Sequence, residues 1–137
     1  MGPKEPTKGS IGGIGTLRSL LERQTQVAFA YLFGSYARGE VSALSDIDIA
    51  VYFVERDLLR CVELRTDLYM ALTRGLGTND IDIVVLNAAS NLMLLDEIIR
   101  CGVALVDRDP DLREDFEQKI LHRAIDFKTQ RRAFLGA

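Results

Sequence analysis

The part of the sequence that decides the fold consists of two short stretches, GSYARGE at residues 34–40 and SDIDIAV at residues 45–51. The first follows an almost wholly apolar run, VAFAYLF at residues 27–33, which predicts a central strand covered on both faces. Gly34 and Ser35 end that strand, and a short helix is expected to begin at Ser35. Backbone N–H groups at such a turn suit phosphate, and a glycine lets a ligand approach the backbone closely. We therefore expect Gly34 and Ser35 to hold phosphate groups.

The second stretch places two carboxylates on one face of a strand. Alternate side chains of an extended strand share a face, so Asp46 and Asp48 project together, opposite Ile47 and Ile49. Like charges this close repel each other, and each tends to raise the pKa of the other. A divalent cation offsets that repulsion, and Mg²⁺ favours carboxylate, phosphate and water oxygens. The pair therefore predicts a magnesium site.

A third acid lies on the next predicted strand, at residues 81–86. Parity places Asp82 on the same face as Asp80 and Val84 and opposite Val85. Three carboxylates opposite a turn that holds phosphate form the layout of two-metal phosphoryl or nucleotidyl transfer. Asp80 itself is expected to mark the entry of the strand.

The rest of the chain predicts helices packed around a short sheet. Four further helices are expected from the spacing of apolar residues and from capping residues: one around Leu17, one between Asp57 and Gly77, one over residues 92–101, and one from Pro110 onward. A short strand at residues 103–106 precedes the last helix. The fold class is therefore α/β, with a mixed sheet of about four strands flanked by helices and a long C-terminal helix. Residues 1–13 are expected to form a flexible tail, and residues 14–137 a single domain.

Composition narrows the class of function. Hydrophobic residues make up 47% and charged residues 27% of the chain, as in an ordinary globular protein. The formal net charge is −3, whereas a protein that holds nucleic acid through phosphates needs a basic face, so direct nucleic-acid binding is not expected. The sequence lacks an apolar run long enough for a membrane span and the apolar segment of a signal peptide, which favours a cytoplasmic location. Cys61 and Cys101 match no metal-binding pattern and are expected to be buried free thiols.

The spacing of these residues resembles a known family. The pattern Gly-Ser, ten residues and Asp-x-Asp, formed here by Gly34, Ser35, Asp46 and Asp48, is similar to the signature of the DNA polymerase beta-like nucleotidyltransferases, and Asp82 matches their third acid. The size and ending of the chain resemble the minimal nucleotidyltransferase (MNT) antitoxins of bacteria and archaea. Those proteins act beside a HEPN-domain ribonuclease toxin, transferring AMP from ATP to a tyrosine of the toxin and so silencing it. The resemblance therefore implies ATP as substrate, two Mg²⁺ ions as cofactor and a HEPN toxin as partner.

Roles follow when the chemistry and the resemblance are combined. Asp46 and Asp48 are expected to bind both Mg²⁺ ions, and Asp82 the ion nearest the attacking hydroxyl, whose proton it helps to remove. The turn at residues 34–35 is expected to hold the triphosphate. Arg38 either neutralises the leaving pyrophosphate or is a solvated surface arginine.

Other residues are open to two interpretations or to an ordinary structural one. Tyr36 either lines the nucleotide pocket or packs against the sheet. The lone histidine, His122, is expected to lie on the surface. Relatives often carry an acid at the position of Val85, but its parity places it away from the metals.

Two other functions remain open at this point. One is transfer to a small molecule such as an aminoglycoside, although such enzymes usually add a helical domain for which 137 residues leave no room. The other is stoichiometric binding of the toxin without catalysis, which the three intact acids argue against. The sequence leaves undecided the preferred nucleotide, the number of AMP units and the acceptor tyrosine. Its apolar terminal helix suits a homo-oligomer or a toxin interface equally well.

Overall fold

The computed structural model describes residues 13–40 and 46–134. Within them the elements follow the predicted order: α1 (Gly13–Glu22), β1 (Val27–Phe33), α2 (Ser35–Arg38), β2 (Ile47–Phe53), α3 (Leu58–Leu76), β3 (Ile81–Val85), α4 (Leu92–Cys101), β4 (Val103–Asp107) and α5 (Pro110–Phe134). The tail predicted at residues 1–13 lies outside the described residues except for Gly13, which begins α1.

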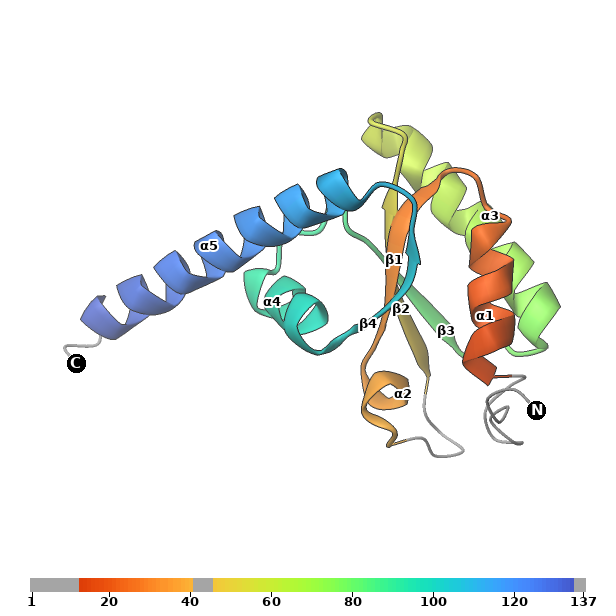
Figure 1. Cartoon of the computed structure of the whole chain (residues 1–137), viewed down its shortest axis with the longest axis horizontal. Helices are drawn as coiled ribbons and strands as arrows, with labels where there is room; N and C mark the ends of the chain where they lie inside the picture. The colour runs from red at the N-terminus through yellow and green to blue at the C-terminus, as the bar shows by residue number, and fades with distance from the viewer. Residues whose placement is uncertain (1–12, 41–45, 135–137) are drawn as a thin grey trace.

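The strands form one mixed sheet, in the order β3-β2-β1-β4. Strand β1 is antiparallel to both β2 and β4, while β2 and β3 are parallel. Helices α1 and α3 lie on one side of the sheet and α4 and α5 on the other (Figure 1). The predicted α/β class with a four-stranded mixed sheet is therefore confirmed.

Strand β1 is the centre of the core, because all seven of its residues are buried. On the side of α1 and α3, alternate residues of β2 from Ile47 to Phe53 join the apolar residues of those helices. On the other side, the rings of Phe29 and Tyr52 stack with their centroids 4.8 Å apart, and Phe116 of α5 lies against both. The apolar run at residues 27–33 thus forms the doubly covered strand that its composition predicts.

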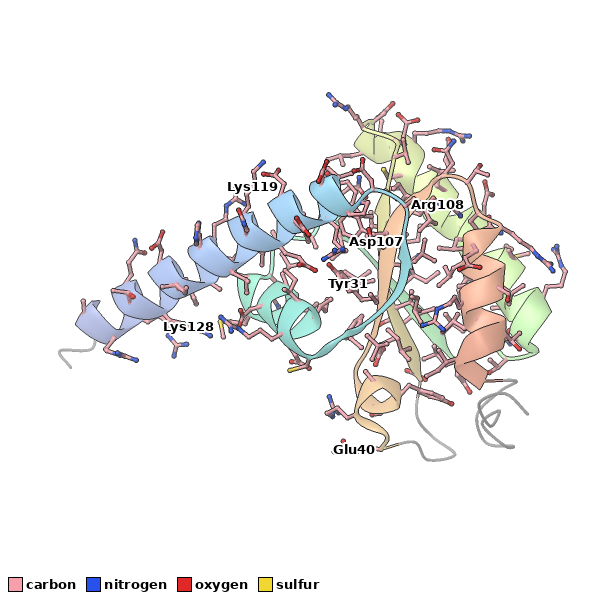
Figure 2. The ribbon with its side chains drawn as sticks, in the orientation of Figure 1. Tyr31, Glu40, Asp107, Arg108, Lys119 and Lys128 are labelled. Carbon is pink, nitrogen blue, oxygen red and sulfur yellow. The ribbon has the colours of Figure 1, made fainter. Side chains whose placement is uncertain are left out.

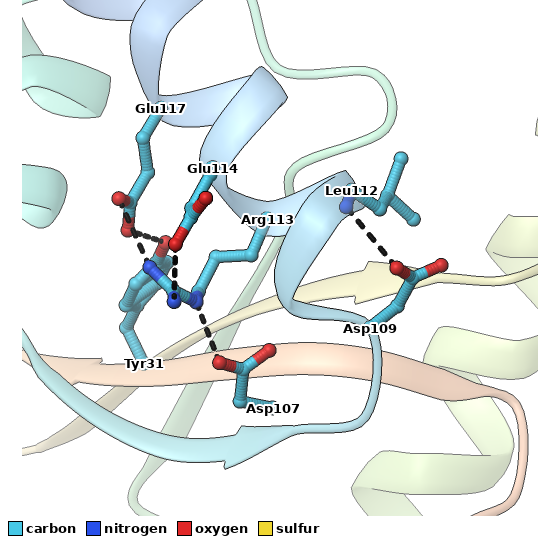
Figure 3. A network of polar contacts seen from close by, with 7 residues as sticks. All are labelled: Tyr31, Asp107, Asp109, Leu112, Arg113, Glu114 and Glu117. Atoms are coloured by element: carbon cyan, nitrogen blue, oxygen red, sulfur yellow. Dashed lines mark hydrogen bonds and ion pairs between the residues drawn. The ribbon is translucent and has the colours of Figure 1, made fainter.

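A network of polar side chains fixes the beginning of α5 to the sheet (Figure 3). The Tyr31 hydroxyl donates to Glu117 Oε2 at 2.5 Å, and Arg113 bonds Asp107 at 2.7 Å and Glu117 at 3.1 Å. Burial and the hydrogen bond to Glu117 raise the pKa of Tyr31, so its hydroxyl keeps the proton that it donates. The first turns of α5 are therefore held to β1 and β4 by paired polar groups.

A buried acid joins α4 to α5. Asp96 is only 5% exposed, and its two carboxylate oxygens accept from Arg100 at 2.7 Å and from Lys128 at 3.1 Å. Burial alone would raise the pKa of Asp96, but the hydrogen bonds from Arg100 and Lys128 outweigh that effect and lower it. Lys128 reaches α4 from the far part of α5 (Figure 2).

Both edge strands of the sheet carry arginine side chains on their carbonyl groups. Arg18 of α1 donates to Leu105 O at 3.1 Å and Ala104 O at 3.4 Å in β4. Arg65 of α3 donates to Ile83 O at 3.0 Å in β3. The helices of one layer thus reach around the sheet to both of its edges.

One expectation about the cysteines is wrong. Cys61 is buried beneath α3, as expected, but Cys101 is exposed. Cys101 is the last residue of α4, where the helix leaves its packed face, and the helical pattern alone does not reveal this. His122 is exposed, as predicted. No helix among the described residues is long and apolar enough to cross a membrane.

Replacing Asp96 by asparagine is expected to lower the free energy of unfolding at neutral pH by about 1–3 kcal/mol, because a buried, charge-assisted pair of hydrogen bonds is lost. The pKa of Asp96 is lower in the folded protein, so its stabilising contribution is present above the pKa of an unfolded aspartate and is lost as the pH falls through the folded value. The difference between wild type and variant should therefore shrink in acid. Denaturant unfolding at pH 7 and near pH 3 measures it, and an equal difference at both would contradict this assignment.

Candidate functional site

The turn between β1 and α2 is shaped around a carboxylate. Gly34 has φ 74° and ψ −150°, a conformation essentially restricted to glycine. A Cβ atom added there would lie 2.3 Å from Asp48 Oδ2. The short helix α2 begins at Ser35, as predicted, and Gly39 ends it with a left-handed φ of 76°. The backbone of this turn therefore lies directly against the side chain of Asp48.

The three predicted acids meet on adjacent strands. Asp46 immediately precedes β2, Asp48 lies within it, and Asp82 lies in β3. Asp48 and Asp82 are directly paired in the parallel register, so their backbones are about 4.8 Å apart. Val84, on the same side of β3 as Asp82, packs toward α4 and α5, whereas Val85 packs toward α1 and α3. The predicted parity of β3, including that of Val85, is confirmed.

Repulsion among these acids falls mainly on Asp48. Its burial, followed by the charges of Asp82 and Asp46, raises the pKa of Asp48, while the charge of Arg38 lowers it. Asp46 and Asp82 are exposed and so remain well solvated. Asp48 is therefore the acid that gains most from a cation placed among the three.

Arg38 is held at the edge of this cluster by two carboxylates. Its Nε lies 2.9 Å from Glu40 Oε1, and its NH1 lies 3.7 Å from Glu97 Oε2 on α4. These ion pairs are well exposed, so each contributes little to stability. The sequence reasoning missed Glu97, since only the packing of α4 beside α2 brings it near Arg38.

The structure decides between the two interpretations of Tyr36. Its ring is half-buried and packs against the core shared with α1 and α3, on the side of the sheet away from the acids. Burial, followed by the charge of Asp80, raises the pKa of Tyr36. Tyr36 therefore packs against the sheet.

The three acids form an open site. No group of three Asp, Glu, His or Cys side chains is gathered closely enough to enclose a metal ion in residues 13–40 and 46–134. An all-carboxylate set on one face of a sheet nevertheless fits Mg²⁺, which keeps several waters and binds through one or two carboxylates together with substrate phosphates. The contact of Gly34 with Asp48 leaves the backbone of the turn beside the same carboxylate, where phosphate oxygens would complete the coordination.

Comparison with known proteins agrees with this geometry. The family model described as "Polymerase beta, Nucleotidyltransferase" matches residues 16–111, more than half of the chain. A crystal structure of a toxin–antitoxin complex with AMP-PNP contains a similar chain, at 29% identity and a TM-score of 0.70, covering 90% of this chain and 95% of that one. No curated protein sequence matches the chain.

Two other solved structures are also similar. One is the tri-AMPylated Shewanella oneidensis HEPN toxin in complex with its MNT antitoxin, at 27% identity and a TM-score of 0.60, covering 90% of this chain and 92% of that one. The other is a toxin–antitoxin MntA–HepT complex, at 26% identity and a TM-score of 0.59, covering 90% of this chain and 93% of that one. The structural neighbours are thus antitoxins of HEPN toxin–antitoxin pairs.

Replacing Gly34 by alanine is expected to displace the Asp48 carboxylate and slow nucleotidyl transfer by about 100-fold, the effect of moving a catalytic group by roughly 1 Å. Gly39→Ala is the control, because Gly39 also has a positive φ but nothing lies within 4 Å of an added Cβ. The control should lose about 1–2 kcal/mol of stability and little activity. Transfer rates and melting curves of both variants test this, and equal loss of activity would exclude a specific role for the Gly34–Asp48 contact.

Proposed function

Because the chain belongs to the polymerase beta nucleotidyltransferase family, whose model matches residues 16–111, we propose that it is the antitoxin of a toxin–antitoxin pair. In this proposal it transfers AMP from ATP to a tyrosine of a HEPN-domain toxin and thereby inactivates the toxin. The carrying observation is the pairing of Asp48 with Asp82 beside the Gly34 turn. Similar chains in the AMP-PNP complex and in the complex with an AMPylated HEPN toxin support the choice of nucleotide and acceptor.

The acids and the turn divide the work of the reaction. Asp46, Asp48 and Asp82 would hold two Mg²⁺ ions, which supply positive charge to the phosphates and to the developing oxyanions. The turn at residues 34–35 and the guanidinium of Arg38 bind the triphosphate. The toxin hydroxyl then attacks the α-phosphorus, a bond forms between that oxygen and AMP, and pyrophosphate leaves.

Exposure separates the roles of the acids. Asp82 is exposed and lies on an edge strand, so an acceptor from another protein can reach it and give up its hydroxyl proton there. Asp48 is partly buried between the turn and the other acids. It therefore acts as a fixed ligand and has little access to the acceptor.

Arg38 is suited to receive the β- and γ-phosphates. Its guanidinium is 45% exposed and already faces carboxylates, so phosphate oxygens can replace Glu40 and Glu97 as its partners at little cost. Of the two interpretations of Arg38, the proposal takes the one in which it binds the leaving pyrophosphate.

The double variant Asp46→Ala/Asp48→Ala is expected to lose AMP transfer while remaining folded, because neither acid contributes an apolar contact to the core. The assay is intact mass of the HEPN-domain protein encoded beside this chain after incubation with the chain, Mg²⁺ and ATP. Wild type should add whole AMP units. Asp67→Ala, an exposed acid on α3 remote from the site, should transfer as wild type does. Continued transfer by the double variant would refute the mechanism.

The same double variant separates catalysis from contact. If AMP transfer silences the toxin, the variant should still bind the HEPN protein but fail to protect cells that express it. Growth of cells carrying both proteins, at equal amounts of complex, measures this. Full protection by the variant would assign neutralisation to stoichiometric binding.

A further inference from the structure

The terminal helix continues beyond the body of the fold. Helix α5 has 25 residues, and only its first turns lie over the sheet, after which it passes α4 and extends away (Figure 1). Its apolar stripe continues in the same way. Leu112, Phe116 and Ile120 pack in the core, whereas Ile125 is 52% exposed and Phe127 is 38% exposed. A stripe that extends past its own core indicates that another surface covers its end.

The end of the helix also differs in charge from the rest of the molecule. Residues 121–133, here called the α5 tail, hold four cations and one acid, a net charge of +3 in a chain whose net charge is −3. The four cations are Arg123, Lys128, Arg131 and Arg132, and the acid is Asp126. The guanidinium of Arg131 lies 5.9 Å from the centroid of the Phe127 ring, so cations and exposed apolar groups share one surface.

The α5 tail lies close to the candidate active site. Lys128 of the tail bonds Asp96 on α4 at 3.1 Å, and the neighbouring Glu97 lies 3.7 Å from Arg38 beside the acids. One helix, α4, therefore separates the tail from the site, a width of about 10–12 Å. A protein bound to the tail can present a side chain to the acids across α4.

We infer that the α5 tail is the docking surface for the protein that accepts AMP, and that its counterpart on that protein is an apolar hollow with an acidic rim. This inference rests on the proposed function and specifies which part of the chain holds the partner. A second copy of the chain is a poorer occupant, because pairing two tails side by side would set a charge of +3 against +3. Nucleic acid matches the charge but leaves the aliphatic side chain of Ile125 exposed, so a protein fits both features.

Two tail variants test the inference against a matched control. Ile125→Ser/Arg132→Glu and Phe127→Ser/Arg131→Glu each remove one exposed apolar group and reverse one charge. Arg56→Glu/Leu59→Ser makes the same change around the start of α3, where Leu59 is 79% exposed. The probe is the purified HEPN-domain protein encoded beside this chain, with its Kd measured by calorimetry for the full-length variants. Each tail variant should bind at least tenfold more weakly than wild type, the control within twofold, and all should bind Mg-ATP equally.

The outcomes distinguish the inference from the function on which it rests. Wild-type binding and transfer, with tail variants that bind the HEPN protein as tightly as wild type, would overturn the docking surface alone. Absence of both binding and transfer in the wild type would overturn the proposed function. A wild-type dimer that the tail variants abolish, or binding of a single-stranded RNA oligonucleotide that they abolish, would assign the tail to a second copy or to nucleic acid and overturn the inference.

Discussion

The confinement of one carboxylate is the constraint on which the rest of the structure depends. Asp48 lies against the backbone of Gly34, where a side chain of any size would collide with it, and beside two other acids. Such an arrangement opposes ionisation, so the surrounding fold must hold it in place. The fully buried strand β1 supplies the rigid support, since it carries the turn at one end and is hydrogen-bonded to β2 along its length. The site is thus built on the most stable part of the molecule.

Helix α4 connects parts of the chain that would otherwise be independent. Glu97 faces Arg38 beside the acids, while the adjacent Asp96 holds Lys128 of the terminal helix. Two neighbouring residues therefore face two different structures, one concerned with phosphate and one with the position of α5. Any shift of the outer part of α5 that moves Lys128 would be transmitted first to α4 and then to the partner of Arg38.

Local pattern was sufficient to predict the elements and the acids of the site. The apolar run at residues 27–33, the alternation around Asp48 and the capping Asp57 each depend on neighbours in sequence, and each has the expected structure. Parity on β3 placed Asp82 correctly because a strand has a period of two. The assignment of these acids as metal ligands remains a prediction.

Features that depend on packing between distant segments were beyond that pattern. The ion pair of Arg38 with Glu97 joins residues 59 positions apart and has no local signal. Cys101 and the end of the α5 stripe illustrate the same limit, because periodicity shows which face of a helix is apolar but not where the core stops covering it. The contact between Gly34 and Asp48 likewise joins the two quoted stretches through the fold.

The arginines at the two sheet edges restrict how other chains can approach. Arg18 and Arg65 bond to carbonyl groups of β4 and β3, the strands at which an added strand would have to pair. Association by strand addition would require the displacement of one of these guanidinium groups, leaving its charge in need of another partner. Recognition through helices carries no such cost. The sheet edges therefore also protect the protein from joining its own copies edge to edge, the contact from which fibrous aggregates grow.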